Sequence, residues 1–202
     1  PVIYVSHSMD EVARLAQHMV LLNAGRVLAA GAVAELLSSL DLPLAQGDLA
    51  SSVVHATVQD HDAVNHLSTL HFDGGQLQLV MARPREIGSQ VQLRVQARDV
   101  SLSLTRPEAS SILNILPVQL LGLREDGPGQ VMVSLQAGQT RLLARITRHS
   151  ATALGLQAGM QLLAIVRCEE IHRAEAAQLF TGQLGRCSAH GRTSARERGL
   201  AR

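Results

Sequence analysis

The chain has 202 residues, and 46% of them are hydrophobic, which is enough to bury a core and excludes a wholly disordered chain. Its net charge of +1 gives no global case for nucleic acid, and one Tyr and two Phe offer almost no platform for base stacking. No apolar run reaches the roughly 18 residues of a membrane-spanning helix. Two cysteines cannot form a disulfide framework, so a reduced compartment is the simpler assumption.

The first forty residues alternate strand and helix signals. The run Val2–Val5 is continuously β-branched or aromatic, which predicts a strand buried on both faces. Ser8 and Glu11 have the spacing of a capping box and predict the start of a helix. The pattern then predicts a hairpin, with strands at Met19–Leu22 and Arg26–Ala30 on either side of a turn at Asn23–Gly25. A short helix is expected over Ala32–Leu40.

The middle of the chain predicts a linker followed by β structure. Residues 41–52 contain Pro, Gly and two acidic groups and predict the linker. The apolar period then becomes two, and Asp73-Gly74-Gly75 predicts a hairpin between strands at 66–72 and 76–81. After Arg98-Asp99 the apolar phase slips by one residue. This slip predicts a bulge or a crossing of the chain between two sheets.

Residues 111–167 again predict mostly β structure. A short helix is expected over Thr147–Leu154, with Thr147 as its cap. Several short strands with one helical turn are typical of a small barrel of the OB type. The remaining strands expected here are Val118–Arg124, Gln130–Leu135, Thr140–Ile146 and Met160–Arg167.

The last part of the chain, residues 172–202, is basic and of low complexity. We expect a disordered tail there, and the alternative is a segment that touches anionic lipid or nucleic acid. The histidines show no metal-ligand spacing. Cys168 and Cys187 have no second pair of ligands, which argues against zinc.

The sequence VIYVSHSMDEV at residues 2–12, together with LLNAGRV at 21–27 and Gly31, resembles the switch-histidine segment of ABC transporter ATPases. The resemblance implies that His7 contacts the γ-phosphate of ATP, with Mg, in a longer parent protein. The chain contains no lysine, so it holds no P-loop, and the signature loop and Walker B carboxylates of the family are missing as well. We therefore expect a fragment that does not hydrolyse ATP by itself.

The sequences SSILNIL at 110–116, LARITRHSA at 143–151 and LGLQAG at 154–159 resemble the molybdate-binding Mop/TOBE domain. The match covers roughly residues 110–168. The resemblance implies that molybdate or tungstate binds at Ser111, Asn114, Thr147, Ser150 and Arg167, in a site between two chains. The helix start at Thr147 and Ser150 is also expected to present N–H groups to an anion.

The sequence departs from this family at Leu113, where the Mop motif often has an arginine. The departure removes a possible charge partner for an oxyanion. An alternative therefore remains open, in which the domain survives as a dimerisation module without a ligand. Serine and threonine at loop ends are also common helix caps.

Taken together, the residues indicate an α/β remnant of an ABC ATPase domain followed by an all-β OB-like domain. The resemblance implies the C-terminal part of the ATP-binding subunit of a molybdate or tungstate importer, which is a homodimer at the cytoplasmic face of the inner membrane with a permease partner. The alternatives are a molybdate-binding regulatory or storage protein without ATPase activity, and an importer subunit for sulfate or sugar, against which Ile146–Ser150 argues. The expected segments are 1–40 (ATPase), 41–52 (linker), 53–105 (β-rich), 106–171 (Mop/TOBE) and 172–202 (tail).

Overall fold

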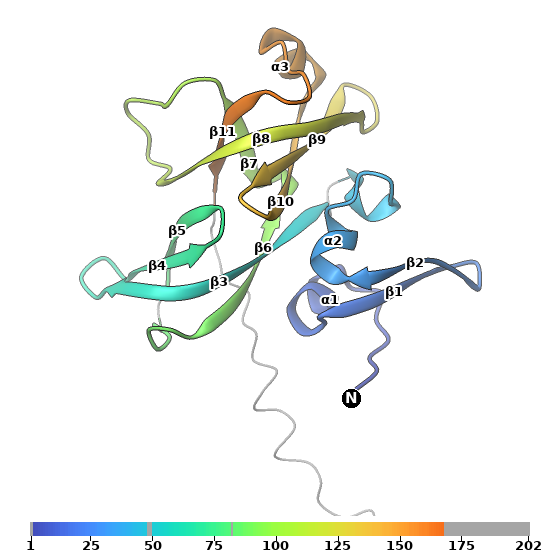
Figure 1. The fold of residues 1–202 in the computed structure, drawn as a ribbon, viewed down its shortest axis with the longest axis horizontal. Coiled ribbons are helices and arrows are strands. Elements are labelled where there is room, and N and C mark those ends of the chain that lie inside the picture. Colours follow the sequence, from blue (N-terminus) through green and yellow to red (C-terminus); the bar gives the residue numbers. More distant parts are fainter. Residues whose placement is uncertain (1, 48–49, 82, 168–202) are drawn as a thin grey trace, which may run out of the picture.

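A computed structural model describes residues 2–47, 50–81 and 83–167, so the predicted basic tail lies outside the described residues. The fold is mostly β and has three parts, which are a small N-terminal module, a four-stranded sheet and a five-stranded sheet (Figure 1). Within the described residues, no helix is long and apolar enough to cross a membrane.

The N-terminal module consists of α1 (Met9–Leu15), the hairpin of β1 (His18–Asn23) and β2 (Arg26–Ala32), and α2 (Val33–Leu37). The Ser8 hydroxyl accepts a hydrogen bond from the Glu11 N–H at 3.4 Å, so the predicted helix start is confirmed. The predicted hairpin is also confirmed. Its two turn residues, Ala24 and Gly25, both have positive φ, as the twist of a two-residue turn requires.

The predicted strand at Val2–Val5 is wrong. The segment forms no strand, and its side chains are exposed, with Ile3 at 93% and Val5 at 92%. A strand exists only where neighbouring backbone supplies hydrogen-bond partners, and no described strand pairs with this run. The apolar side chains of this run are therefore suited to burial, but they do not by themselves determine a strand.

The four-stranded sheet is antiparallel and has the order β5-β4-β3-β6. The predicted hairpin around Asp73-Gly74-Gly75 is confirmed, and it joins β4 to β5. The 3-10 turn η1 (Pro43–Ala45) precedes this sheet. Its strands are β3 (Ser51–Asp62), β4 (Leu67–Phe72), β5 (Gly75–Val80) and β6 (Gln90–Gln96).

The chain passes from this sheet to the next through the short turn η3 (Ala97–Asp99). The strand before the turn, β6, belongs to the four-stranded sheet, and β7 (Val100–Ser103) belongs to the five-stranded one. The slip in apolar phase at Arg98-Asp99 therefore marks a crossing of the chain between the two sheets. This is one of the two outcomes that the slip predicts.

The five-stranded sheet is antiparallel in the order β10-β9-β8-β11-β7, and its elements agree with the predicted strands and helix. One apolar core joins both sheets, with Val54 and Leu70 from one and Leu120 and Leu135 from the other. The elements are β8 (Asn114–Glu125), β9 (Gln130–Ala137), β10 (Thr140–Thr147), α3 (Arg148–Ala153) and β11 (Gln161–Val166).

The turns of two hairpins, one from each sheet, interlock at Asp73 and Gly138. The Asp73 carboxylate accepts hydrogen bonds from the Gln139 N–H and, at 2.6 Å, from the Thr140 hydroxyl. A Cβ added at Gly138 would lie 2.6 Å from the Asp73 carbonyl carbon. Only glycine leaves room for the two turns at this distance.

Replacing Gly138 by alanine should lower the free energy of unfolding by about 1–3 kcal/mol more than replacing Gly155, because it adds a steric clash. The two glycines have nearly the same φ, +58° and +59°, but a Cβ at Gly155 meets nothing within 4 Å. The difference between them therefore isolates the clash from backbone strain. Urea unfolding followed by circular dichroism measures both, and equal losses would contradict the interlock.

Candidate functional site

An open cavity of about 620 Å³ lies beside β7 and β10, the two edge strands of the five-stranded sheet, and α3 contributes to its wall. Two of the predicted binding residues, Thr147 and Ser150, line it. The other lining residues are Arg98, Val100, Ser101, Leu102, Gln130, Arg145, Ile146, His149, Ala153 and Leu154.

Thr147 and Ser150 are held together by the start of α3. The Thr147 hydroxyl accepts a hydrogen bond from the Ser150 N–H at 3.0 Å, and the two hydroxyl oxygens lie 2.8 Å apart. The predicted cap is confirmed. The Arg148 N–H donates to the Gly129 carbonyl at 2.9 Å. Two of the first N–H groups of the helix are thus occupied, so the hydroxyls are better placed than these amides to meet an anion.

Two arginines, Arg98 and Arg145, line the same cavity, and neither is among the predicted site residues. Arg145 precedes Thr147 by two residues on β10, so both side chains belong to the same face of the strand. That spacing could have identified Arg145. Arg98 lies on η3, and its place at the cavity depends on the crossing between sheets, which no local pattern specifies.

Ser111 and Arg167 do not line this cavity. Ser111 is exposed in the irregular segment before β8. Arg167 follows β11, and its backbone N–H donates to the Asp99 carbonyl at 2.8 Å. Both residues belong to the predicted binding set with Thr147 and Ser150, and the structure places them outside the cavity that these two line with Arg98 and Arg145.

Asn114 is buried and joins the two sheets. Its amide oxygen accepts from the Gln78 N–H at 2.6 Å, and its amide nitrogen donates to the Gln78 carbonyl at 3.0 Å. The side chain thus connects β8 to β5 through both backbone groups of one residue. Asn114 is outside the cavity lining.

His7 is exposed in the N-terminal module, away from the cavity residues. The nearby Glu11 carboxylate accepts hydrogen bonds from the Ser6 hydroxyl at 2.6 Å and the Tyr4 hydroxyl at 2.9 Å. The hydrogen bond to Glu11 and its negative charge raise the pKa of Tyr4. Among the described residues, no group of three His, Cys, Asp or Glu side chains is arranged to hold a metal ion.

A family model described as the TOBE domain matches residues 110–172. Most of the cavity-lining side chains, including Arg145, Thr147 and Ser150, lie within the residues that this model matches, whereas Arg98 precedes them.

Curated relatives match a larger part of the chain. The molybdenum import ATP-binding protein ModC of Albidiferax ferrireducens is 52% identical over 168 residues, and that of Hahella chejuensis is 49% identical over 168 residues. Each match covers 83% of this chain, and 45% and 47% of the respective relative. The chain is thus a homologue of these ATP-binding proteins and spans about half their length. The predicted resemblance is confirmed.

Among solved structures, the chain is similar to the cytoplasmic molybdate-binding protein ModG with molybdate bound. It is 22% identical with a TM-score of 0.48, and the match covers 59% of this chain and 92% of that one.

Replacing Asn114 by alanine should lower the free energy of unfolding by about 1–3 kcal/mol, because it removes a buried side chain that pairs with both backbone groups of Gln78 and leaves them without that partner. Asn65 is the matched control, since it makes its hydrogen bonds with Asp62 at an exposed turn. Asn65→Ala should cost much less. Urea unfolding compares the two variants, and equal costs would show that Asn114 is not a tie between the sheets.

Proposed function

We propose that this chain is the C-terminal part of the ATP-binding subunit of a molybdate or tungstate importer, and that its TOBE domain binds the oxyanion as a regulatory ligand. The observation that carries the proposal is the meeting of the Thr147 and Ser150 hydroxyls with Arg98 and Arg145 at one cavity. The homology to the ModC proteins supports the same assignment.

The chemistry of the cavity suits a tetrahedral dianion. Molybdate and tungstate offer only hydrogen-bond acceptors at neutral pH, so their site needs donors. Hydroxyls supply one donor each, and a guanidinium supplies up to five in a planar fork with a positive charge. Arg98 and Arg145 would supply positive charge to the oxyanion in place of the cation that the Mop motif often has at the position of Leu113.

A second copy of the chain would complete the site. Ser111, Asn114 and Arg167 match the binding motif of the Mop family but lie outside the cavity lining. In a homodimer, Ser111 and Arg167 of one copy would approach the cavity of the other. Asn114 would support that site indirectly, through its hold on Gln78.

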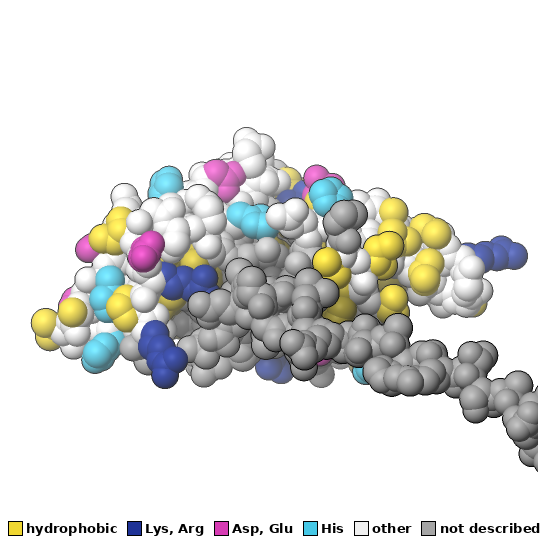
Figure 2. All heavy atoms as spheres, turned by 90° about the horizontal axis from the view of Figure 1, so that it is seen from below, with side chains coloured by type: hydrophobic (Ala, Val, Ile, Leu, Met, Phe, Trp, Pro, Cys, Tyr) yellow, Lys and Arg dark blue, Asp and Glu magenta, His cyan; other side chains and the backbone are white. Residues whose placement is uncertain are grey.

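The N-terminal module fits the end of an ABC ATPase domain. His7 precedes a capped helix and is exposed, as contact with the γ-phosphate of ATP would require. The Val2–Val5 run and the β1–β2 hairpin expose large apolar side chains, which the rest of an ATPase domain would cover. Figure 2 shows apolar side chains gathered at this end of the molecule. The parent protein would use ATP with Mg and drive a membrane permease from the cytoplasmic face of the inner membrane.

The purified chain should show no ATP hydrolysis above a buffer blank, because it contains no phosphate-binding loop. In the full-length parent, His7→Ala should lower turnover and leave ATP binding largely intact, since the histidine would act on the γ-phosphate. Phosphate release and nucleotide titration measure the two quantities. Turnover by the chain alone at about 1 per second or more, or loss of binding without loss of turnover, would contradict the assignment.

Titration calorimetry should detect molybdate and tungstate, and Ser150→Ala should weaken both about tenfold or more, because a hydrogen bond to a charged group is worth about 1.5–3 kcal/mol. Thr152→Ala is the matched control: Thr152 lies on the same helix, donates to the Arg148 carbonyl and is not part of the cavity lining. Arg167→Ala should abolish the heat if a second copy completes the site.

Equal binding of sulfate would indicate a generic anion site. A folded wild type that gives no heat with any of these oxyanions would show that the TOBE domain here is only structural. Equal effects of Ser150→Ala and Thr152→Ala would place the oxyanion elsewhere.

A further inference from the structure

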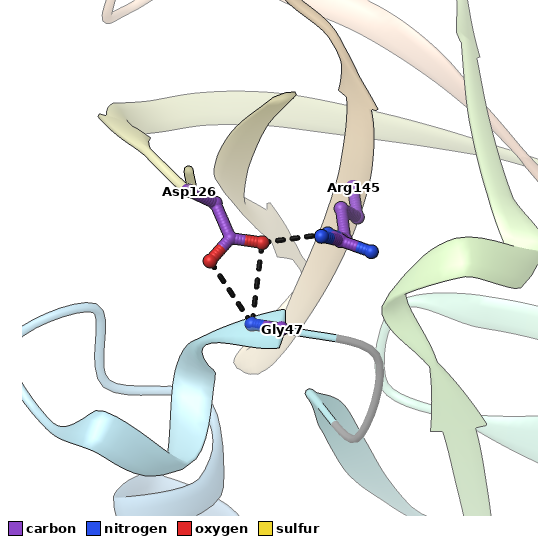
Figure 3. Close-up of polar contacts among 3 residues, drawn as sticks. All are labelled: Gly47, Asp126 and Arg145. Atoms are coloured by element: carbon purple, nitrogen blue, oxygen red, sulfur yellow. Dashed lines mark hydrogen bonds and ion pairs between the residues drawn. The ribbon is translucent and has the colours of Figure 1, made fainter. Parts of the chain in front are cut away.

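The Asp126 carboxylate connects two parts of the chain that are distant in sequence (Figure 3). It accepts hydrogen bonds from the Gly47 N–H, at 2.9 Å to Oδ1 and 3.2 Å to Oδ2. Its Oδ2 also accepts from the Arg145 Nε at 2.6 Å, which makes an ion pair. We call Gly47, Asp126 and Arg145 the Asp126 latch.

The latch fastens the segment between the N-terminal module and the sheets. Gly47 follows η1, whose Ala45 is buried in a small core with Met132 and Leu143 of the five-stranded sheet. Arg124, two residues before Asp126, donates to the Leu40 carbonyl at the other end of the same segment. The position of residues 40–47 thus depends on side chains from the end of β8 and the turn after it.

The third member of the latch also borders the cavity. Arg145 lines it together with Thr147 and Ser150. The Asp126 side chain is only 7% exposed and that of Arg145 20%, so water screens their attraction poorly. An oxyanion in the cavity would bring a second negative group to the guanidinium that now neutralises Asp126.

We propose that an oxyanion in the cavity competes with the Asp126 carboxylate for Arg145, so that its binding releases Gly47 and loosens the linker. A carboxylate that is little exposed is stable only while it is paired. When Arg145 turns to the oxyanion, Asp126 gains by moving into water, and the Gly47 N–H then loses its acceptor. The inference rests on the proposed oxyanion function. It names the residues through which binding of an oxyanion in the cavity would be transmitted to the N-terminal module.

The coupling must be reciprocal, because each equilibrium biases the other by the same factor. If the oxyanion weakens the latch, a weakened latch must favour the oxyanion. Asp126→Asn keeps the shape of the side chain and removes its charge. It should therefore tighten molybdate binding, about fivefold or more for a coupling of ordinary size.

The experiment uses the whole chain labelled with ¹⁵N and compares the hydrogen exchange of the Gly47 amide with and without sodium molybdate. In the wild type, saturating molybdate should accelerate this exchange about fivefold or more, and in Asp126→Asn it should leave the exchange unchanged. Calorimetry on the same samples gives the affinities. Circular dichroism checks that each variant is folded.

Glu125→Gln is the matched control, because Glu125 is the neighbouring acidic residue and forms an exposed ion pair with Arg148. It removes the same charge without touching the latch, so it should leave both the molybdate affinity and the Gly47 exchange close to those of the wild type. Arg145→Lys tests the latch if Asp126→Asn does not fold. It keeps the charge but loses the Nε–H donor, and molybdate should then no longer alter the Gly47 exchange.

The outcomes separate the two proposals. Absence of heat with molybdate in a folded wild type overturns the oxyanion function and the latch together. Heat with an unchanged or slower Gly47 exchange overturns the latch alone. Equal tightening by Glu125→Gln and Asp126→Asn also overturns it, since general charge would then explain the affinity.

Discussion

The crossing of the chain at Ala97–Asp99 is the constraint on which the rest of the structure depends. It sends β6 and β7 into different sheets, and both sheets then bury their apolar faces in one core. The sheets therefore cannot shift relative to each other without opening that core, whose packing is dense and intolerant of voids. The same turn carries Arg98 to the cavity and offers the Asp99 carbonyl to Arg167.

The absence of lysine from the sequence matters for the chemistry of this cavity. A lysine ammonium is a compact charge that follows one strong acceptor, whereas a guanidinium presents donors on several edges of one plane. Arg145 directs Nε to Asp126 while its side chain also borders the cavity. An arginine is thus suited to a position between two negative groups, and its planar fork makes the choice between them sensitive to geometry.

Much of the fold could be predicted from the sequence, because caps, two-residue turns and period-two strands depend on neighbouring residues. The Ser8 and Thr147 caps and the slip at Arg98-Asp99 are of this kind. The Val2–Val5 strand could not be predicted correctly, since a strand depends on a partner that the pattern does not specify.

The candidate site was only partly predictable for the same reason. The resemblance identified Thr147 and Ser150, which the fold brings to the cavity. It also selected Asn114, whose amide is used between the sheets, and it offered no reason to select Arg98. Spacing along β10 would have indicated Arg145, because residues two apart on a strand share a face.

Two aspartates of this chain do similar work at turns, and their difference shows what a switch requires. Asp73 and Asp126 each accept a hydrogen bond from a backbone N–H far away in the sequence, that of Gln139 and that of Gly47. The second partner of Asp73 is the Thr140 hydroxyl, a neutral group beside a turn that only glycine fits. The second partner of Asp126 is a cation that borders a cavity suited to anions. A ligand in the cavity can change the electrostatic balance at Asp126 but has no such access to Asp73. In the proposed competition, the Asp126 contact is therefore the switch, whereas the Asp73 contact is fixed.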